Sequence, residues 1–427
     1  MILRCLLGAF GVVFTALSTC PAAEPIPADP SAIELPSPDQ RAQLYPEIAT
    51  DGAGTFLVVW QQGTLYFEAE TASVYVLRLD AAGRPLDRQP IALSATGGSQ
   101  ERPRVVFSAG VFFVVWHDLR NGRDWDVYAA RVKPDGTVLD PSGMLVAGGV
   151  ANQASPAVAP APTGALIVWQ HYGGRFYQVN AAVLSARGEV GPVQTLGYEG
   201  RVLHGGDVSV ARMGDHWLIA WKDETQWTMG GDRITRFFGR LRLVGQGLQV
   251  EQVERSPGVL VGRGSGRLAS DGAQAALFAA WGAVGRGQEI PIGAVFEGGN
   301  AAALPNPEPV QTRGISAWDG SRMLALFGID AQVTGPVAVA FGEDGFLLAG
   351  RMAASGKGPP SFRIVTSRFA RDGRRLGPVK PLRVVHESRR ALGNPALAFA
   401  GRAFLMVFGQ DDGDGRQRLF AKPIVVE

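Results

Sequence analysis

Cysteine is nearly absent from this sequence. The chain has two cysteines in 427 residues, and both lie among the first 20. The rest of the chain therefore has no disulfide framework, no thiol nucleophile and no cysteine-ligated zinc site. Histidine is also scarce, and its five scattered copies argue against a histidine-rich metal site. We expect no cofactor.

Long basic runs are absent as well. The formal net charge is +2, and arginines alternate with acidic residues along the chain. Binding to nucleic acid needs basic residues gathered on one face, so no nucleic-acid partner is expected. After the N-terminus no apolar run reaches the roughly 18 residues of a membrane-spanning helix. No stretch combines a 3.6-residue period with helix caps, which favours an all-β fold.

The first residues have the pattern of an export signal. Arg4 supplies the positive charge, residues 5–17 are apolar, and small residues follow. Two processing routes are open. An ordinary signal peptidase would cut near Ala22 or Ala23. Alternatively, the tetrapeptide LSTC resembles a lipobox in which Cys20 is lipidated, although its threonine departs from the usual residue. If Cys20 is acylated, its lipid is the one membrane attachment we expect.

This pattern divides the chain into three segments. Residues 1–23 form the signal, or a lipoprotein signal that ends before Cys20, and residues 24–31 form a proline-rich spacer. Residues 32–427 are expected to form a single domain. The protein is expected outside the cytoplasm, in the periplasm, at the outer membrane or in the medium.

The rest of the sequence contains a repeat. Similar segments begin at Pro46, Pro103, Pro156, Asp207, Gly266 and Pro395. The first five starts are 51 to 59 residues apart, which is the spacing of stacked supersecondary units. The chain also has 56 glycines and 28 prolines, enough for many tight turns between short strands.

Each repeat divides into four expected strands. The first is short and rich in small residues, as in residues 48–50. The second is a continuous apolar run ending in an aromatic residue, as in residues 56–60, which indicates burial on both faces. The third carries an aliphatic–Arg–aliphatic pattern before a glycine turn, as in VYVLRLDAAG, and the fourth is less apolar. The radial, four-stranded blades of a β-propeller explain this gradient.

The two ends of the domain predict how the blades meet. The last repeat lacks a fourth strand, and residues 33–35 match the fourth strand of the first repeat. The N-terminal strand is therefore expected to complete the C-terminal blade and close the ring. Two hairpin-like segments start at Gly314 and Pro336, only 22 residues apart. Seven blades result if one of them is an insertion, and eight if one blade is truncated; seven is preferred.

These repeats resemble those of bacterial secreted and lipoprotein β-propellers, and they are loosely similar to the TolB-like and FG-GAP classes. The resemblance covers nearly the whole chain after the signal. It implies a propeller fold, which hosts many unrelated functions.

The loops after the second strands are the expected ligand site. In a propeller they emerge on one face, together with the loops that connect one blade to the next. Here they mix aromatic and polar residues, which suits stacking and oriented hydrogen bonds with a glycan or a protein. The candidate residues are Tyr66, Arg120, Trp125, Tyr172, Arg175, Tyr177 and Trp227.

Two acidic loops have the closely spaced oxygens that calcium requires. One is HDLRNGRDWD, with Asp118, Asp124 and Asp126, and the other is GQDDGDG at residues 409–415. Neither fits the D-x-D-x-D-G pattern, and the same residue types suit ordinary turns. No metal is therefore assigned.

Three functions remain open. The preferred one is a monomeric binding or interaction module of the cell envelope, with an envelope protein or a glycan as partner. The second is a propeller enzyme that cleaves glycans, for which the pairs Asp223–Glu224 and Glu68–Glu70 offer carboxylates. No sialidase-type Asp-box or Ser-His-Asp order supports it, so no catalytic residue is assigned. The third is a purely structural scaffold.

Overall fold

The computed structural model shows an all-β protein. It describes residues 31–63, 71–94, 97–173, 177–196, 208–226, 233–255, 267–270, 272, 275–284, 288–297, 323–328, 338–353, 361–371, 374–378, 380–386, 395–401, 403–411 and 416–425. Within these ranges the regular structure consists of strands and contains no helix, so the predicted class is confirmed. No helix long and apolar enough to cross a membrane is found in this part of the chain.

The described strands form seven four-stranded antiparallel sheets. The first sheet holds β2 (Gln43–Thr50), β3 (Phe56–Gln62), β4 (Ser73–Leu79) and β5 (Ile91–Ala92). The second holds β6 (Gln100–Ser108), β7 (Val111–Asp118), β8 (Asp126–Val132) and β9 (Met144–Ala147). The third sheet holds β10 (Asn152–Ala161), β11 (Gly164–Tyr172), β12 (Tyr177–Ser185) and β13 (Gln194–Thr195). The fourth holds β14 (Ser209–Met213), β15 (His216–Gln226), β16 (Arg233–Val244) and β17 (Gly247–Arg255). The fifth sheet holds β18 (Arg267–Ser270), β19 (Ala275–Val284), β20 (Gln288–Glu297) and β21 (Met323–Gly328). The sixth holds β22 (Ala338–Phe341), β23 (Gly345–Ala353), β24 (Ser361–Ala370) and β25 (Lys380–His386). The seventh holds β26 (Ala396–Ala400), β27 (Ala403–Asp411) and β28 (Gln417–Val425) together with β1 (Ile33–Glu34).

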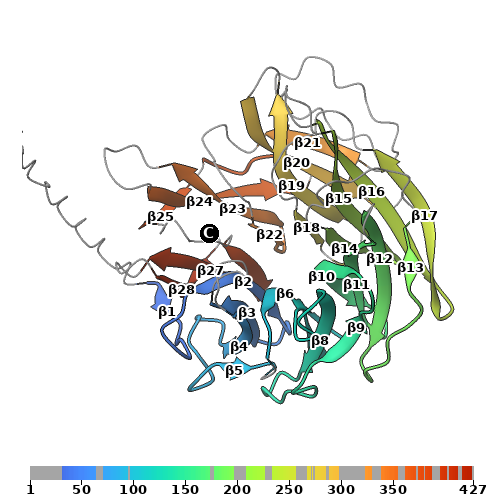
Figure 1. The fold of residues 1–427 in the computed structure, drawn as a ribbon. Helices are drawn as coiled ribbons and strands as arrows, with labels where there is room; N and C mark the ends of the chain where they lie inside the picture. The colour runs from blue at the N-terminus through green and yellow to red at the C-terminus, as the bar shows by residue number, and fades with distance from the viewer. Residues whose placement is uncertain are drawn as a thin grey trace, which may run out of the picture.

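The sheets lie side by side around a common centre, with their first strands nearest to it (Figure 1). Each first strand contacts the first strand of the next sheet, from β2 through β6, β10, β14, β18 and β22 to β26, and β26 contacts β2. Four-stranded sheets in this arrangement fit the blades of a propeller.

The second strands carry the core. In β7, Phe112, Val114 and Trp116 pack against residues of β3, whereas Phe113 and Val115 pack against residues of β11. All five side chains are 0% exposed. Successive side chains of a strand point to opposite faces, so a continuous apolar run fills both spaces between neighbouring sheets. Each such side chain contributes about 1.5–3 kcal/mol relative to its exposed state.

The first strands are longer than the sequence suggested. In three sheets the strand begins at or one residue before the glutamine of a Q-x-x-P segment, which is Gln43, Gln100 or Gln153. The pairing register shifts at each segment. The residue before each proline is left-handed, with φ of 52° at Tyr45, 53° at Arg102 and 51° at Ser155. This conformation is uncommon for residues other than glycine and disfavoured before proline, so each segment is a built-in β-bulge.

The ends of the chain meet in one sheet. β1 pairs with β28, with Ile33 opposite Ala421 and Glu34 opposite Phe420. This is the pairing that the missing fourth strand predicted. The segment that starts at Gly314 differs from expectation, because its described part, β21, is the fourth strand of the sheet begun by β18.

The arginine of the third strand joins neighbouring sheets. Arg131 on β8 donates to Asp140 of its own sheet through Nε and Nη2, each over 2.8 Å. Its Nη1 donates over 2.7 Å to the carbonyl oxygen of Ala186, in the turn of the next sheet. A Cβ atom on Gly188 of that turn would lie 3.0 Å from the guanidinium. Arg78 and Asp87 repeat the arrangement one sheet earlier, with Pro134 as the carbonyl partner.

We predict that Arg131→Ala lowers the free energy of unfolding by about 1–3 kcal/mol, because it leaves Asp140 and a turn carbonyl without their charged donor. Arg131→Lys should recover only part of the loss, since one ammonium group cannot span both partners. Urea unfolding measures the effect.

Arg123→Ala is the matched control. Its side chain is 71% exposed and pairs with Asp124 on the surface, so the change should stay below about 0.5 kcal/mol. Equal losses in the two variants would contradict the proposed inter-sheet role.

Candidate functional site

The candidate residues that the structure describes, Arg120, Trp125, Tyr172 and Tyr177, lie at one end of the sheets, which we call the polar face. Here the first strands begin and the second strands end, as the pairs Gln43–Gln62, Gln100–Asp118 and Asn152–Tyr172 show. Several residues predicted to lie in loops belong to these strand ends instead. They are Gln61, Gln62, His117, Asp118, His171, Tyr172 and Tyr177.

The polar side chains at the strand ends satisfy the buried tryptophans. Trp60 donates through Nε1 to Oε1 of Gln62, and Trp116 to Oδ2 of Asp118, each over 2.9 Å. In the third sheet Trp169 donates over 2.9 Å to Gln153 of the Q-x-x-P segment. Because a buried indole N–H needs an acceptor, these polar residues belong to the architecture.

In two sheets the residue after the tryptophan holds the bulge of the next sheet. The backbone N–H of Arg102 donates to Oε1 of Gln61 over 3.2 Å. The N–H of Ser155 donates to Nδ1 of His117 over 3.1 Å. The strained residues before the prolines are therefore fixed by the neighbouring sheet, which is how strain of this kind persists.

Arg120, a predicted ligand residue, has an internal role. It donates to both oxygens of the fully buried Asp118, through Nε over 3.0 Å and Nη2 over 2.6 Å. Nη1 donates to the carbonyl oxygen of Ser142, and the guanidinium lies 3.7 Å from the ring centre of Tyr128. Nη2 also donates over 3.1 Å to Oγ of Ser94, which follows β5 of the preceding sheet, so the arginine holds the loop against two sheets.

The acidic residues of the same loop do not share a site. Asp118 is engaged by Trp116 and Arg120, Asp124 pairs with Arg123, and Asp126 accepts from Asn121 over 2.9 Å. In the described ranges no group of three or more His, Cys, Asp or Glu residues is placed to hold a metal ion. The calcium hypothesis gains no support from this geometry.

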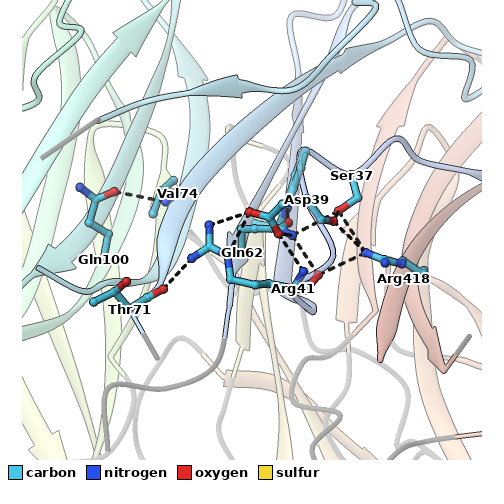
Figure 2. Close-up of polar contacts among 9 residues, drawn as sticks. Ser37, Asp39, Arg41, Gln62, Thr71, Val74, Gln100 and Arg418 are labelled. Carbon is cyan, nitrogen blue, oxygen red and sulfur yellow. Dashed lines mark hydrogen bonds and ion pairs between the residues drawn. The ribbon is translucent and has the colours of Figure 1, made fainter. Parts of the chain in front are cut away.

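A second polar cluster ties the ends of the chain together (Figure 2). Asp39, in the segment after β1, accepts from Arg41 and from the Nε2 of Gln62, the latter over 2.7 Å. Burial raises the pKa of Asp39, but the hydrogen bonds from Arg41 and Gln62 outweigh it and lower the pKa below its usual value. Arg418 of β28 reaches Ser37 in the same segment over 3.1 Å. Gln62, predicted as a loop residue, thus serves this junction.

The aromatic candidates that are described come from neighbouring sheets. The ring of Trp125 lies 4.5 Å from that of His117, and Tyr172 stacks on Tyr177 at 4.5 Å. The backbone of Trp125 is bonded to the next sheet, because its N–H donates to Oδ1 of Asn152, the residue opposite Tyr172. All three aromatic side chains are half-buried, so each keeps part of its surface open to a ligand.

Other candidates fall outside the description. Tyr66, Arg175, Trp227, Glu68, Glu70 and Cys20 lie outside the described residues. Asp223 and Glu224 lie in β15 opposite Thr235 and Ile234, at positions where the side chains are not described.

Sequence reasoning missed a charged group near the centre. Glu47 on β2 accepts through Oε1 from Nη1 of Arg104 on β6 and, over 2.6 Å, from Nη2 of Arg267 on β18. Their side chains are only 17–23% exposed. The sequence does show that these charged residues lie on strands otherwise rich in small residues. It does not show that they meet, because they are up to 220 positions apart.

Two titratable groups on the polar face have shifted pKa values. Burial lowers the pKa of His117, and nearby Arg102 and Arg104 add to this, although Glu101 opposes it. Burial raises the pKa of Asp126, and the charges of Asp124 and Asp118 act in the same direction. Oδ1 of Asp126 is a buried oxygen without a hydrogen-bond partner.

Comparison with known proteins bears on the fold alone. No family model matches the chain, and no curated protein matches its sequence. A solved structure of a protein of unknown function from Dyadobacter fermentans aligns over 93% of this chain and 98% of its own, with a TM-score of 0.50 and 10% identity. At such identity the likeness concerns the fold and says nothing of activity.

Two solved glycoside hydrolases align less closely. A Penicillium chrysogenum α-L-arabinanase aligns over 92% of this chain and 97% of its own, with a TM-score of 0.48 and 9% identity. A Fusarium graminearum GH93 α-L-arabinofuranosidase covers the same shares with a TM-score of 0.45 and 9% identity. These values carry no argument about function, and the resemblance to TolB-like and FG-GAP repeats stays a prediction.

We predict that His117 makes folding stability depend on pH. Its folded-state pKa lies below the usual value of about 6.5, so the unfolded chain takes up the proton first as pH falls. The stabilisation is complete above about pH 6.5 and is lost on acidification toward the folded-state pKa.

His117→Gln should reduce this loss, because Gln61 already accepts the equivalent N–H one sheet earlier. Some slope should remain from His216, whose pKa is also lowered by burial. Urea unfolding between about pH 7.5 and 5 measures both proteins. Parallel pH profiles would rule out the contribution of His117.

Proposed function

We propose that the seven sheets are the blades of one closed β-propeller that is exported and binds carbohydrate on its polar face. Two features support closure: the succession of contacts from β2 to β26 and back to β2, and the pairing of β1 with β28. Export rests on the signal pattern of residues 1–23, and lipidation of Cys20 on the LSTC segment.

Carbohydrate binding rests on the half-buried aromatic side chains of neighbouring blades. Trp125 and Tyr172 are held in place by Asn152, which accepts from the N–H of Trp125 and lies opposite Tyr172 in the sheet. Gln153 adds a second link, since its N–H donates to the carbonyl oxygen of Trp125 over 2.6 Å. Its side chain contacts Nδ1 of His171 at the same distance.

This arrangement suits a sugar. The apolar face of a pyranose or furanose ring stacks on an aromatic ring, while its hydroxyl groups need oriented polar partners. Trp125 and the Tyr172–Tyr177 stack offer the first, and the half-buried imidazole of His171 beside them offers the second. Rigid aromatic groups also lose little conformational entropy when a ligand binds.

We predict that Trp125→Ala and Tyr172→Ala each weaken glycan binding about tenfold or more, equivalent to about 1.4 kcal/mol. The mature protein is first applied to a glycan array, and the best neutral oligosaccharide is then titrated by calorimetry. Leu86→Ala is the control, because Leu86 is 48% exposed and lies in the turn at the opposite end of the strands. The control should retain full affinity.

Unchanged affinity in both aromatic variants would remove the polar face from consideration. An empty array combined with capture of an envelope protein by the wild type, but not by the aromatic variants, would favour the protein-interaction alternative.

Asp126 favours a second candidate, a glycan-cleaving enzyme. Glycoside hydrolysis needs one carboxyl group that stays protonated near neutral pH, and burial beside other carboxylates raises a pKa in this way. Asp126 follows Trp125 directly, lies opposite Asp118 and has a raised pKa. In this reading the sugar that stacks on Trp125 receives its proton from Asp126.

The enzyme candidate predicts release of reducing sugar from a glycan bound on the array. Asp126→Asn should reduce the rate at least a hundredfold, within the range for loss of a general acid. Glu189→Gln, in the exposed turn at the opposite end of the strands, should leave it nearly unchanged. Binding without any release of sugar would leave the protein a binding module.

A further inference from the structure

His117 belongs to a closed circuit of contacts that runs through two sheets. Its ring lies 4.5 Å from the ring of Trp125. The backbone of Trp125 is bonded to β10 twice, since its N–H donates to Asn152 and its carbonyl oxygen accepts from the N–H of Gln153. Further along β10, the N–H of Ser155 donates back to Nδ1 of His117. The imidazole therefore reaches the indole directly and also through the first strand of the next sheet.

The hydrogen bonds fix which nitrogen of the imidazole carries the proton. Nδ1 of His117 accepts from the N–H of Ser155 over 3.1 Å, so the proton of the neutral ring is on Nε2. Nε2 lies 3.8 Å from a carboxylate oxygen of Glu101, the residue opposite His117 in β6. A second proton can only go to Nδ1, where it faces the N–H of Ser155. Two donors cannot bond each other, so protonation breaks the circuit at this point.

The charged groups that face the imidazole come from β6. Burial lowers the pKa of His117, Glu101 raises it, and Arg102 and Arg104 lower it again, so that the net shift is downward. From the segments on its other sides the ring meets an indole and a backbone N–H, both of which are neutral. The neutral imidazole is therefore the form that holds the circuit at neutral pH.

We propose that His117 is a positioning residue of the glycan site: its neutral imidazole holds Trp125 in place, and its protonation releases the bound sugar. This inference rests on the proposed carbohydrate-binding function and adds the regulation of that site by pH. When Nδ1 no longer accepts from Ser155, the left-handed residue before Pro156 loses its support from the neighbouring sheet. Asn152, in the same strand, then holds the indole less firmly, and the ring no longer offers a fixed surface for stacking.

The test measures affinity against pH. The best neutral oligosaccharide from the array, which carries no titrating group of its own, is titrated by calorimetry against the full mature chain between about pH 7.5 and 4.5. Wild-type affinity should be full above about pH 6.5 and fall by up to about tenfold toward the lower folded-state pKa of His117. His117→Gln should flatten this profile, because an amide oxygen accepts the equivalent N–H at Gln61. Circular dichroism establishes that each protein is folded at each pH.

Four further variants separate positioning from other effects of pH. In Trp125→Ala the weak binding that remains should no longer depend on pH, since nothing is left for His117 to position. His171→Gln and Asp126→Asn remove the ionisable groups beside the aromatic side chains, and both should keep the loss of affinity in acid. His216→Gln is the matched control, because His216 is also buried with a lowered pKa but lies at the opposite end of the strands. It should leave the affinity profile unchanged.

NMR gives a readout that a merely structural histidine would not move. Binding and protonation are linked, so a glycan that requires the neutral ring lowers the pKa of His117 further. The imidazole signals are titrated with and without the oligosaccharide, and the signal missing in His117→Gln identifies the residue. The pKa should be lower in the complex.

The two proposals fail in different ways. The pH inference is overturned if the sugar binds at pH 7.5 but His117→Gln or Trp125→Ala loses affinity in acid as the wild type does. An equal pKa of His117 in the free and bound protein would overturn it as well. Carbohydrate binding stands in both cases. If no glycan bound at pH 7.5, both proposals would fall together.

Discussion

The second strands of the first three sheets, β3, β7 and β11, each bury a tryptophan whose indole nitrogen donates a hydrogen bond to a polar side chain. Much of the polar face follows from this requirement. The acceptors are Gln62, Asp118 and Gln153, and each one is placed by further bonds to a loop or to the next sheet. Asp118 fixes Arg120, Gln62 fixes the segment around Asp39, and Gln153 fixes Trp125 and His171. The need of the buried indole N–H groups for acceptors thus determines how the polar groups at the surface are arranged.

The same demand explains why sequence reasoning succeeded in some places and failed in others. Apolar runs such as residues 112–116 define second strands, since only burial on both faces tolerates them. The polar residues after them read as loop, because Gln61, His117 and Asp118 break the apolar run. They are strand residues nonetheless, and their polarity serves buried partners. The recurrent Q-x-x-P segment was a local signal for this, visible in the sequence but without meaning until the bulges were seen.

Other features had no local signal. Glu47 meets Arg267 across 220 positions, and Arg418 meets Ser37 across 381, so neither contact follows from spacing. In the sequence Arg120 and Trp125 were equally good candidates for ligand binding, because both are long side chains with a polar group in the same loop. The structure separates them, because Arg120 donates to Asp118, Ser142 and Ser94, whereas Trp125 keeps part of its ring open. Such differences depend on which neighbour satisfies a side chain, which a single sequence does not record.

The pairing of β1 with β28 also governs the order of events during synthesis. Strands joined by short turns pair as soon as they leave the ribosome, but the last sheet waits for a partner made almost 400 residues earlier. Until both ends meet, β28 presents an unpaired edge and the N-terminal strand has no sheet. The sheet that joins β1 to β28 can therefore form only after β28 has been synthesised, however early the other six sheets have formed.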